Sequence, residues 1–217
     1  MKVVIPAKNS STRVLSKNFR PFYKGQSLFD IKVSQLLLSF APNEIYVSSE
    51  DPAVAQHAER WGLNFLIREP YLAKNETPYP YVVSEICKQV PGDDDIAWCH
   101  LTDPLFNDYG SCLTAWKQAR LENDCLVVVY PFRGYLLDEN HCPMGFGFGP
   151  RHVRSQLLPT RYLLGFTLSL LHRKTAVTAG PIGGNPFWFH ATNRTVDIDD
   201  ETDFVLAQAI YQHLAAG

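Results

Sequence analysis

Basic and acidic side chains are separated along this chain in a way that indicates phosphate chemistry. The first 29 residues carry six basic side chains and no acidic one, at Lys2, Lys8, Arg13, Lys17, Arg20 and Lys24. Near the other end, residues 197–203 read Asp-Ile-Asp-Asp-Glu-Thr-Asp. A cationic segment can bind a polyphosphate, and carboxylates can supply the oxygen ligands of the Mg²⁺ that accompanies it. The pattern predicts nucleotide chemistry.

The acidic cluster divides into two parts with different expected roles. Asp197 and Asp199 are two residues apart on an expected extended segment, so their side chains project to the same side and can share one Mg²⁺. The acids that follow suit the start of a helix. Asp200 can cap the last helix, and Glu201 and Asp203 are favourable in its first turn.

The basic segment follows a short apolar stretch. Residues 3–7 read Val-Val-Ile-Pro-Ala and lead into a polar loop over residues 8–17. An α/β fold holds a polyphosphate at the carboxyl edge of its first strand in this layout. Phosphoryl-type transfer mainly requires positioning and neutralisation of charge, so Lys8, Arg13 and Lys17 are candidate catalytic cations.

Composition is that of one α/β domain of enzyme size, residues 1–217. The chain is 46% hydrophobic, with a net charge of -2 and a pI near 6.4, which argues against a nucleic-acid binder. Five cysteines without a C-x-x-C pattern suggest neither a disulfide framework nor a zinc site. No signal peptide or membrane-spanning run is evident, so we expect a cytoplasmic protein that does not contact a membrane.

Apolar runs alternate with helical patterns, which indicates βαβ units and a largely parallel sheet. Strands are expected at 2–7, 44–49, 64–69, 96–102, 125–131 and 162–172. Helices are expected at 27–40, from Asp51-Pro52 to Gly62, and at 79–90, 108–122 and 200–214. The fold class is therefore α/β, with helices covering both faces of the sheet.

The strand and helix rhythm is interrupted at about 133–160. Five prolines and glycines lie between Pro143 and Pro150, with no helical period. Phenylalanines between these glycines are costly to leave in water, so we expect an excursion from the sheet that contacts a second subunit. The chain is expected to be a homodimer.

Several blocks of the chain resemble the CMP-sugar-acid synthetases, the cytidylyltransferases that activate sialic acid, related nonulosonates and Kdo. Residues 5–18 resemble their opening motif, and residues 47–50 resemble their Val-Ser-Thr-Asp segment. Residues 67–73, 101–105 and 196–199 resemble three further blocks, in the family's order. The resemblance implies a Rossmann-like, three-layer nucleotidyltransferase that binds CTP and Mg²⁺, transfers CMP to an acidic sugar and releases pyrophosphate.

The resemblance also implies roles for individual residues. Ala7, Ser11, Asn18 and Arg68 match positions that bind the nucleotide, with Arg68 near the base. Lys8, Arg13, Lys17 and Asp199 fall at catalytic positions, and Asp197 and Asp199 at the metal site. His100, Asp103 and Arg154 match the acceptor side, with Arg154 presented by the excursion to a neighbouring subunit.

The chain departs from the family at positions that concern the phosphates and the acceptor. Thr12 stands where a lysine is usual, with Arg13 beside it, His100 replaces a common glutamine, and Asp103 replaces a serine. An arginine can still contact phosphate, although its fork differs from an ammonium. His100 beside Asp103 is either an oriented acid–base pair or a core histidine.

Three hypotheses follow from these residues. The first is a cytidylyltransferase for a nonulosonate, a Kdo-like acid or another small anion such as a phosphonate. The second is a metal-dependent glycosyltransferase, because Asp197-Ile198-Asp199 also fits a D-x-D pattern, although it lies unusually near the C-terminus for one. The third is a non-catalytic, nucleotide-binding subunit.

Overall fold

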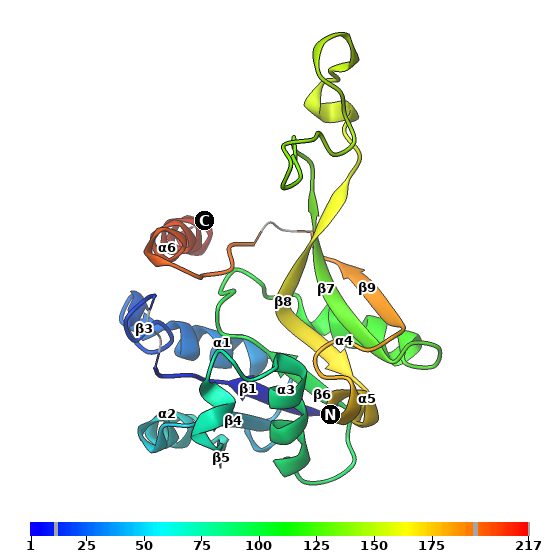
Figure 1. Cartoon of the computed structure of the whole chain (residues 1–217). Helices are drawn as coiled ribbons and strands as arrows, with labels where there is room; N and C mark the ends of the chain where they lie inside the picture. The colour runs from blue at the N-terminus through cyan, green and yellow to red at the C-terminus, as the bar shows by residue number, and fades with distance from the viewer. Residues whose placement is uncertain (11–12, 193–194, 217) are drawn as a thin grey trace.

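The computed structural model describes residues 1–10, 13–192 and 195–216. Its centre is a seven-stranded sheet with the order β5-β4-β1-β6-β8-β7-β9 (Figure 1). The strands are β1 (Lys2–Pro6), β4 (Ile45–Ser49), β5 (Asn64–Ile67), β6 (Ile96–Cys99), β7 (Cys125–Phe132), β8 (Arg161–Leu171) and β9 (Pro186–His190). β8 runs antiparallel to both of its neighbours, and the other strand pairs of this sheet are parallel. The predicted mostly parallel sheet is confirmed.

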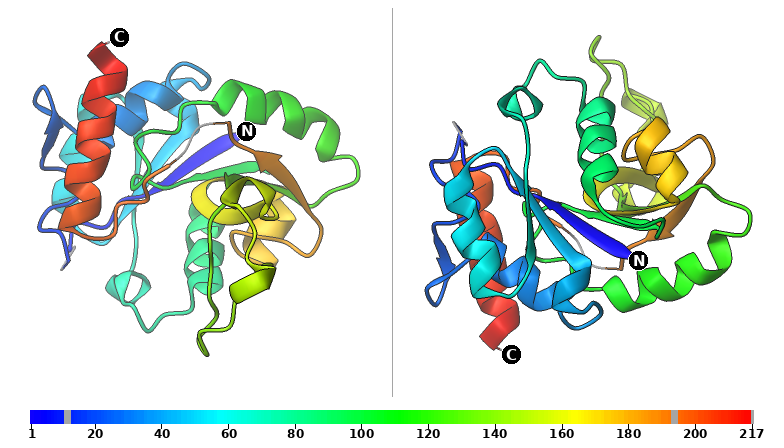
Figure 2. Two further views of the ribbon diagram at one scale, coloured as in Figure 1. Left: turned by 90° about the horizontal axis from the view of Figure 1, so that it is seen from above. Right: turned by 90° about the horizontal axis from the view of Figure 1, so that it is seen from below.

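Helices cover both faces of the sheet, as expected of a three-layer fold (Figure 2). The helices are α1 (Leu28–Leu36), α2 (Ala55–Arg60), α3 (Tyr79–Gln89), α4 (Tyr109–Ala119), α5 (Arg173–Thr178) and α6 (Glu201–Ala216). Alternation along β1 assigns the faces. Val3 and Ile5 pack with α1, α2 and α4, whereas Val4 packs with α3 and α5. The predicted α/β fold class is confirmed.

A third apolar cluster lies outside the sheet and anchors the two segments that carry the predicted site. It joins Val14 of the basic loop to Ile198 of the acidic segment, and both side chains are fully buried. Phe204 of α6 and Phe22 of β2 (Pro21–Tyr23), which pairs with β3 (Gln26–Ser27), complete the contact. Residues separated by almost the whole chain are thereby held side by side.

Some predicted elements differ at their ends. The expected helix 27–40 ends at Leu36, because Leu38 and Ser39 continue in tighter turns with bonds to Gln35 and Leu36. The helix expected from Asp51 begins as a 3-10 turn, Pro52–Val54, capped by the Asp51 side chain. Pattern analysis missed β2, β3, β9 and α5, which are short.

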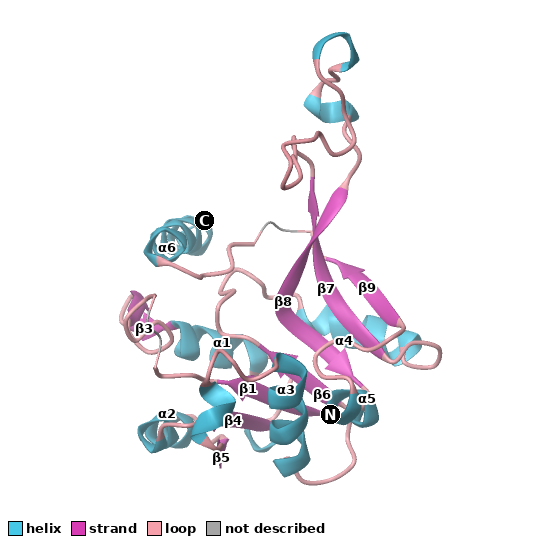
Figure 3. Cartoon of the chain, in the orientation of Figure 1, coloured by secondary structure: helices cyan, strands magenta, loops and turns pink. Residues whose placement is uncertain are grey.

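The segment between β7 and β8 extends away from the sheet (Figure 3). It contains two 3-10 helices, Gly149–Arg151 and Ser155–Leu157, and an isolated bridge between Leu137 and Pro143. Phe148 in this segment is 62% exposed, and Tyr162 and Leu163 at the base of β8 are about half exposed, at 49% and 52%. No helix among the described residues is long and apolar enough to cross a membrane.

Candidate active site

A pocket of about 330 Å³ lies at the carboxyl ends of β1 and β6. Five of the predicted site residues line it: Lys8, Arg13, Lys17, Asn18 and His100. Parallel strands end at the same edge of a sheet, and the loops that follow them therefore meet there. The structure thus places the basic loop beside the end of β6, which lies about 90 residues later in the chain. The order of these segments in the sequence does not by itself reveal that they are neighbours.

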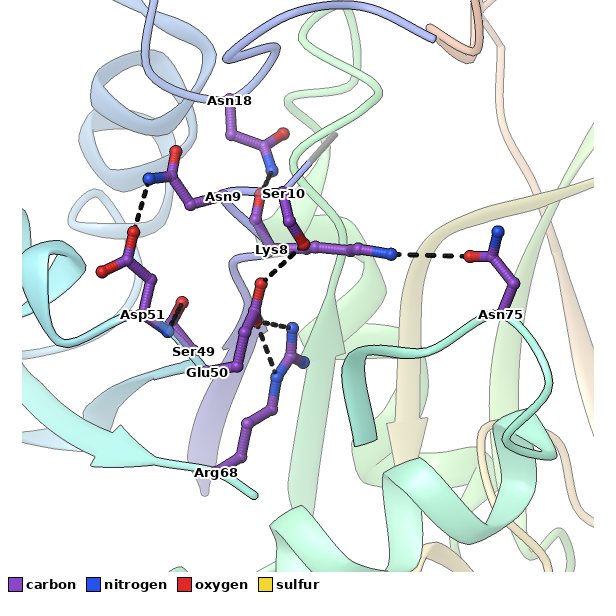
Figure 4. Close-up of polar contacts among 9 residues, drawn as sticks. All are labelled: Lys8, Asn9, Ser10, Asn18, Ser49, Glu50, Asp51, Arg68 and Asn75. Atoms are coloured by element: carbon purple, nitrogen blue, oxygen red, sulfur yellow. Dashed lines mark hydrogen bonds and ion pairs between the residues drawn. The ribbon is translucent and has the colours of Figure 1, made fainter. Parts of the chain in front are cut away.

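The start of the basic loop is tied to two neighbouring loops (Figure 4). Asn9 donates to the Asp51 carboxylate at 2.7 Å, and the Ser10 hydroxyl donates to Glu50 at 3.0 Å. The Lys8 ammonium lies 3.5 Å from the amide oxygen of Asn75. These bonds join the loop after β1 to the loop after β4, so the position of the Lys8 charge is set before any ligand binds.

A buried ion pair between Arg68 and Glu50 supports this arrangement of loops. The Arg68 guanidinium donates to Glu50 Oε2 from Nη2 at 2.7 Å and from Nε at 3.2 Å, and the two side chains are only 4% and 12% exposed. Burial alone would raise the pKa of Glu50, but bonds from Arg68 and Ser10 hold it below its ordinary value. Arg68 does not line the pocket and is bonded to Glu50, which accepts from Ser10, so its predicted contact with the nucleotide stays a prediction.

Asn18 is buried beside the loop and keeps one polar atom without a partner. Its amide nitrogen donates to the Lys8 carbonyl at 2.8 Å, whereas its Oδ1 is buried without a hydrogen bond to the described residues. An unpaired buried acceptor is costly and calls for an explanation. It fits a donor group of a ligand in the pocket. Ala7 differs, because its methyl is in the core and its N–H donates to Ser48 O, so at most its carbonyl can serve a nucleotide.

Lys17 connects the basic loop to the acidic segment. Its ammonium donates to the Ile198 carbonyl, and the side chain is 9% exposed. Burial lowers the pKa of Lys17, and the nearby carboxylates of Asp199 and Asp197 oppose that shift. Arg13, from the same loop, pairs with Asp199 at 2.8 Å. Predicted cations and predicted metal ligands therefore form one cluster.

Asp197 and Asp199, the predicted metal ligands, carry charges that affect each other. Burial raises the pKa of Asp197, a hydrogen bond from Thr102 lowers it, and the Asp199 charge raises it further, which indicates two carboxylates close together. Among the described residues there is no group of three or more His, Cys, Asp or Glu that could hold a metal. Two carboxylates still fit Mg²⁺, which is commonly held by one or two carboxylates together with substrate phosphates.

His100 closes the other end of the pocket as a neutral imidazole. Its Nε2 lies 2.6 Å from the Tyr79 hydroxyl and 3.1 Å from Trp98 Nε1, and an indole can only donate. Nε2 is therefore the acceptor, which leaves the proton on Nδ1. Burial, followed by the charges of Lys32 and Lys17, lowers the pKa of His100 to about 4. Phe166 lies against its ring, at 6.1 Å between centroids.

Asp103 is not an acceptor-binding residue, contrary to the prediction. It is 2% exposed, and both of its oxygens are used inside the fold. Oδ1 accepts the N–H groups of Leu105 and Phe106 at 3.2 Å, and Oδ2 accepts the hydroxyls of Tyr130, at 2.6 Å, and Thr167. Of the two alternatives for His100, the structure does not show the acid–base pair with Asp103, because each side chain is bonded to other groups.

The remaining predicted residues either lie apart from this pocket or fall outside the residues that the structure describes. Arg154 is exposed and precedes the second 3-10 helix of the excursion, which points away from the sheet. Ser11 and Thr12 lie outside the described residues. The predicted role of Asp200 is confirmed, since its carboxylate accepts the N–H of Asp203 at 2.9 Å at the start of α6.

Sequence reasoning missed four polar residues near this site: Asn9, Asp51, Asn75 and Lys32. The first three carry no pattern, because their partners lie in other loops. Lys32 does carry one. It occupies the apolar face of α1 with Phe29 and Leu36, at helical spacing, and it is 0% exposed. A lysine on the buried face of a helix is a signal in its own right.

Residues 2–104 match the family model described as cytidylyltransferase. This match covers β1, the basic loop and the turn after β6. No curated protein sequence matches the chain significantly.

Solved structures with this fold include several nucleotidyltransferases. A CMP:2-keto-3-deoxy-manno-octonic acid synthetase complexed with CTP is similar with a TM-score of 0.68 at 14% identity, over 98% of both chains. A 4-diphosphocytidyl-2C-methyl-D-erythritol synthase from Anaerococcus prevotii has a TM-score of 0.64 at 11% identity, over 97% of both chains. A putative glucose-1-phosphate thymidylyltransferase from Bacillus anthracis reaches 0.67 at 11% identity, over 96% of this chain and 94% of its own. These likenesses establish the fold.

Proposed function

From the premise that residues 2–104 belong to the cytidylyltransferase family, we propose that the chain transfers CMP from CTP to a small acidic acceptor and releases pyrophosphate. The family match confirms the predicted family and enzyme class, a CTP-dependent nucleotidyltransferase. The acceptor class, the Mg²⁺ dependence and the release of pyrophosphate are the proposed part.

One observation carries the proposal. The Lys17 ammonium is buried where the basic loop meets Asp197 and Asp199, at the carboxyl edge of the sheet. Lys17 and the buried unpaired acceptor of Asn18 line one pocket, and Arg13, which also lines it, pairs with Asp199 of the acidic segment beside it. Surface charge alone would not place them together, whereas the transfer of a nucleotidyl group needs both cations for the phosphates and oxygen ligands for their metal.

In the proposed reaction an oxygen of the acceptor attacks the α-phosphorus of CTP, and the bond to the β-phosphate oxygen breaks. Lys8 and Lys17 neutralise the phosphate oxygens and hold the triphosphate in line for this attack. Arg13 binds Asp199 at 2.8 Å in the present structure and can exchange that partner for a phosphate. Asn18 Oδ1 accepts a hydroxyl of the nucleotide. Pyrophosphate is the leaving group.

Asp197 and Asp199 would hold Mg²⁺, for the reasons of donor chemistry given above. When bound there, Mg²⁺ would neutralise charge that develops on the phosphates during transfer. The ion pair of Arg13 with Asp199 balances the carboxylate charge in this structure. If Mg²⁺ took the place of Arg13 beside Asp199, the negative charge of the acidic segment would be balanced both before and after the metal binds.

The acceptor side is formed by His100 and its aromatic neighbours. In this proposal the neutral imidazole donates through Nδ1–H to the acceptor, at the position where the resembling family commonly has a glutamine. Phe166, which is 38% exposed, offers an apolar surface beside it. We therefore propose a nonulosonic or Kdo-like sugar acid, with a carbon face that can pack on this ring, ahead of a small phosphonate.

Release of pyrophosphate from CTP across a panel of nonulosonic acids, Kdo and phosphonates tests the proposal. Turnover with one acid, with CTP and with Mg²⁺ is the expected result, and ATP, GTP and UTP serve as controls. Asp199→Asn should abolish turnover, while Asp200→Asn, its matched neighbour, should retain it because asparagine caps a helix equally well. Nucleotide binding without turnover would favour the non-catalytic subunit, and sugar transfer from a nucleotide sugar would favour the glycosyltransferase.

We further propose that the protein acts in the cytoplasm as a homodimer and that Arg154 serves the site of the partner subunit. Exposed Phe148, Tyr162 and Trp188 lie along the excursion and the adjoining strands, where a second copy would cover them. Mixed dimers test this role. If Arg154→Ala and Asp199→Asn are each inactive, mixing them should restore roughly a quarter of the wild-type activity, because one site of each mixed dimer is intact. No recovery would contradict a role across subunits.

A further inference from the structure

Lys32 is a second buried lysine, and the proposed reaction does not use it. It lies in α1 with no exposed surface, and its ammonium donates to the Asp103 main-chain oxygen at 2.8 Å and to the Tyr109 hydroxyl at 2.6 Å. Burial lowers the pKa of Lys32, while the Asp103 carboxylate opposes that shift. A buried ammonium is costly unless a counter-charge and hydrogen bonds compensate for it.

The Lys32 ammonium contacts Asp103 through the main-chain oxygen, while the Asp103 carboxylate, whose charge favours the ammonium, holds its own turn. That carboxylate accepts from Leu105 and Phe106 in the turn after β6, and from Tyr130 of β7 and Thr167 of β8. The turn is thereby attached to two further strands. Truncating Lys32 would remove the hydrogen bond to the Asp103 carbonyl and a positive charge near the buried carboxylate, and the turn would have to move or take up water.

The turn that Asp103 holds is the support of the acidic segment. The carbonyl next to that of Asp103 belongs to Thr102 and accepts the N–H of Ile198 at 2.9 Å. The Ile198 carbonyl in turn accepts from the Lys17 ammonium. The Ile198 residue is therefore fixed at both its N–H and its carbonyl, and its flanking carboxylates, Asp197 and Asp199, take their positions from it.

We propose that Lys32 and Asp103 form a buried pair of positioning residues that holds the Asp197–Asp199 segment in register with the nucleotide loop. This inference rests on the proposed function, because the register is proposed to serve a metal that those two carboxylates hold. It also explains why the chain carries an aspartate where the resembling family has serine: the acid accompanies the lysine in α1.

Calorimetry with CTP alone and with Mn²⁺·CTP tests the pair without requiring turnover. The ratio of the two dissociation constants measures how much the metal adds to binding. Lys32→Met should reduce that ratio about tenfold while CTP alone binds within about twofold of wild type, since residues that orient metal ligands affect affinity by roughly this factor. A merely structural role would lower the melting temperature and leave the ratio unchanged.

The double variant Lys32→Met, Asp103→Asn is the rescue. It removes both charges of the pair, the asparagine still accepts from the turn, and the hydroxyls of Tyr130 and Thr167 can rotate to accept from its amide. The ratio should return to within about threefold of wild type. A double variant as impaired as Lys32→Met, or a folded Lys32→Met with the wild-type ratio, would overturn the pair.

Tyr109→Phe keeps the inference testable if Lys32→Met does not fold. It removes one acceptor of the ammonium and preserves both charges, so the ratio should fall about threefold, as expected for one lost hydrogen bond. An unchanged ratio in a folded Tyr109→Phe would overturn the pair. Wild-type protein that binds no CTP would overturn the proposed function as well, whereas normal CTP binding with no effect of these variants would overturn this inference alone.

Discussion

The two sides of the pocket are constructed in different ways. On the nucleotide side, charged and amide groups from three loops bind one another, from Lys8–Asn75 to Glu50–Arg68. On the acceptor side, His100 is neutral and surrounded by the rings of Tyr79, Trp98 and Phe166. Most residues of both sides lie in the part of the chain that matches the cytidylyltransferase family. The departure at His100 from the resembling family lies on the acceptor side.

This difference indicates how far the residues of each side can vary between enzymes. A triphosphate has the same charge whatever it is attached to, so the cations that meet it have little freedom to vary. The acceptor differs between enzymes, and a side formed by ring packing can change its shape one residue at a time. Substitutions on each side of the pocket therefore test whether the two sides differ in this way.

The largest effect is expected from Lys17→Met on the nucleotide side. Methionine keeps the length of the side chain and removes the charge that lies between the phosphates and the acidic segment. Loss of one such electrostatic contact should lower kcat by about 100- to 1,000-fold. Pyrophosphate release measures this loss.

Lys24→Met provides the control for Lys17→Met. Lys24 is exposed at the turn between β2 and β3, where its ammonium lies 5.1 Å from the Tyr23 ring. Its removal should leave kcat within about twofold, as is usual for a surface substitution. Equal losses in the two variants would mean that general charge, rather than the position of Lys17, assists the reaction.

Glu50→Gln should produce the next largest effect, on stability. It would leave the Arg68 guanidinium, in a side chain only 4% exposed, without its counter-charge. Removal of one member of a buried pair costs about 3 kcal/mol of unfolding free energy. Glu85→Gln is the matched control, because Glu85 pairs with Lys88 at 2.6 Å at the surface. That pair should contribute less than about 1 kcal/mol.

Urea unfolding distinguishes these two glutamines. A similar loss in both would mean that the nucleotide side gains no special stability from its buried pair. The contrast between a pre-formed nucleotide side and a ring-packed acceptor side would then have no energetic basis.

Local sequence predicted the nucleotide side better than the acceptor side for a physical reason. The strand before the basic loop and the spacing of Asp197 and Asp199 are visible in short stretches of sequence. Asp103 is different, because its partners Tyr130 and Thr167 lie 27 and 64 residues away, and its association with Lys32 spans 71. Such contacts depend on strand order, and the antiparallel insertion of β8 beside β6 was not predicted.

His100→Gln should have the smallest effect and concerns the acceptor side. The pKa of His100 in the folded protein is about 4, below the ordinary histidine value of about 6.5. Between these two pH values the imidazole is protonated in the unfolded chain and neutral in the folded protein. The wild type should therefore lose stability as the pH falls from about 6.5 to about 4, by on the order of 2 kcal/mol.

The glutamine variant cannot take up this proton, so its unfolding free energy should fall less over the same interval. Urea unfolding at pH 7 and at pH 4.5 measures the difference, and His213→Gln, on the exposed end of α6, controls for the substitution itself. Parallel decreases in wild type and His100→Gln would show that the imidazole is protonated in the folded state. The acceptor would then meet a cation at this position, and the electrical difference between the two sides of the pocket would disappear.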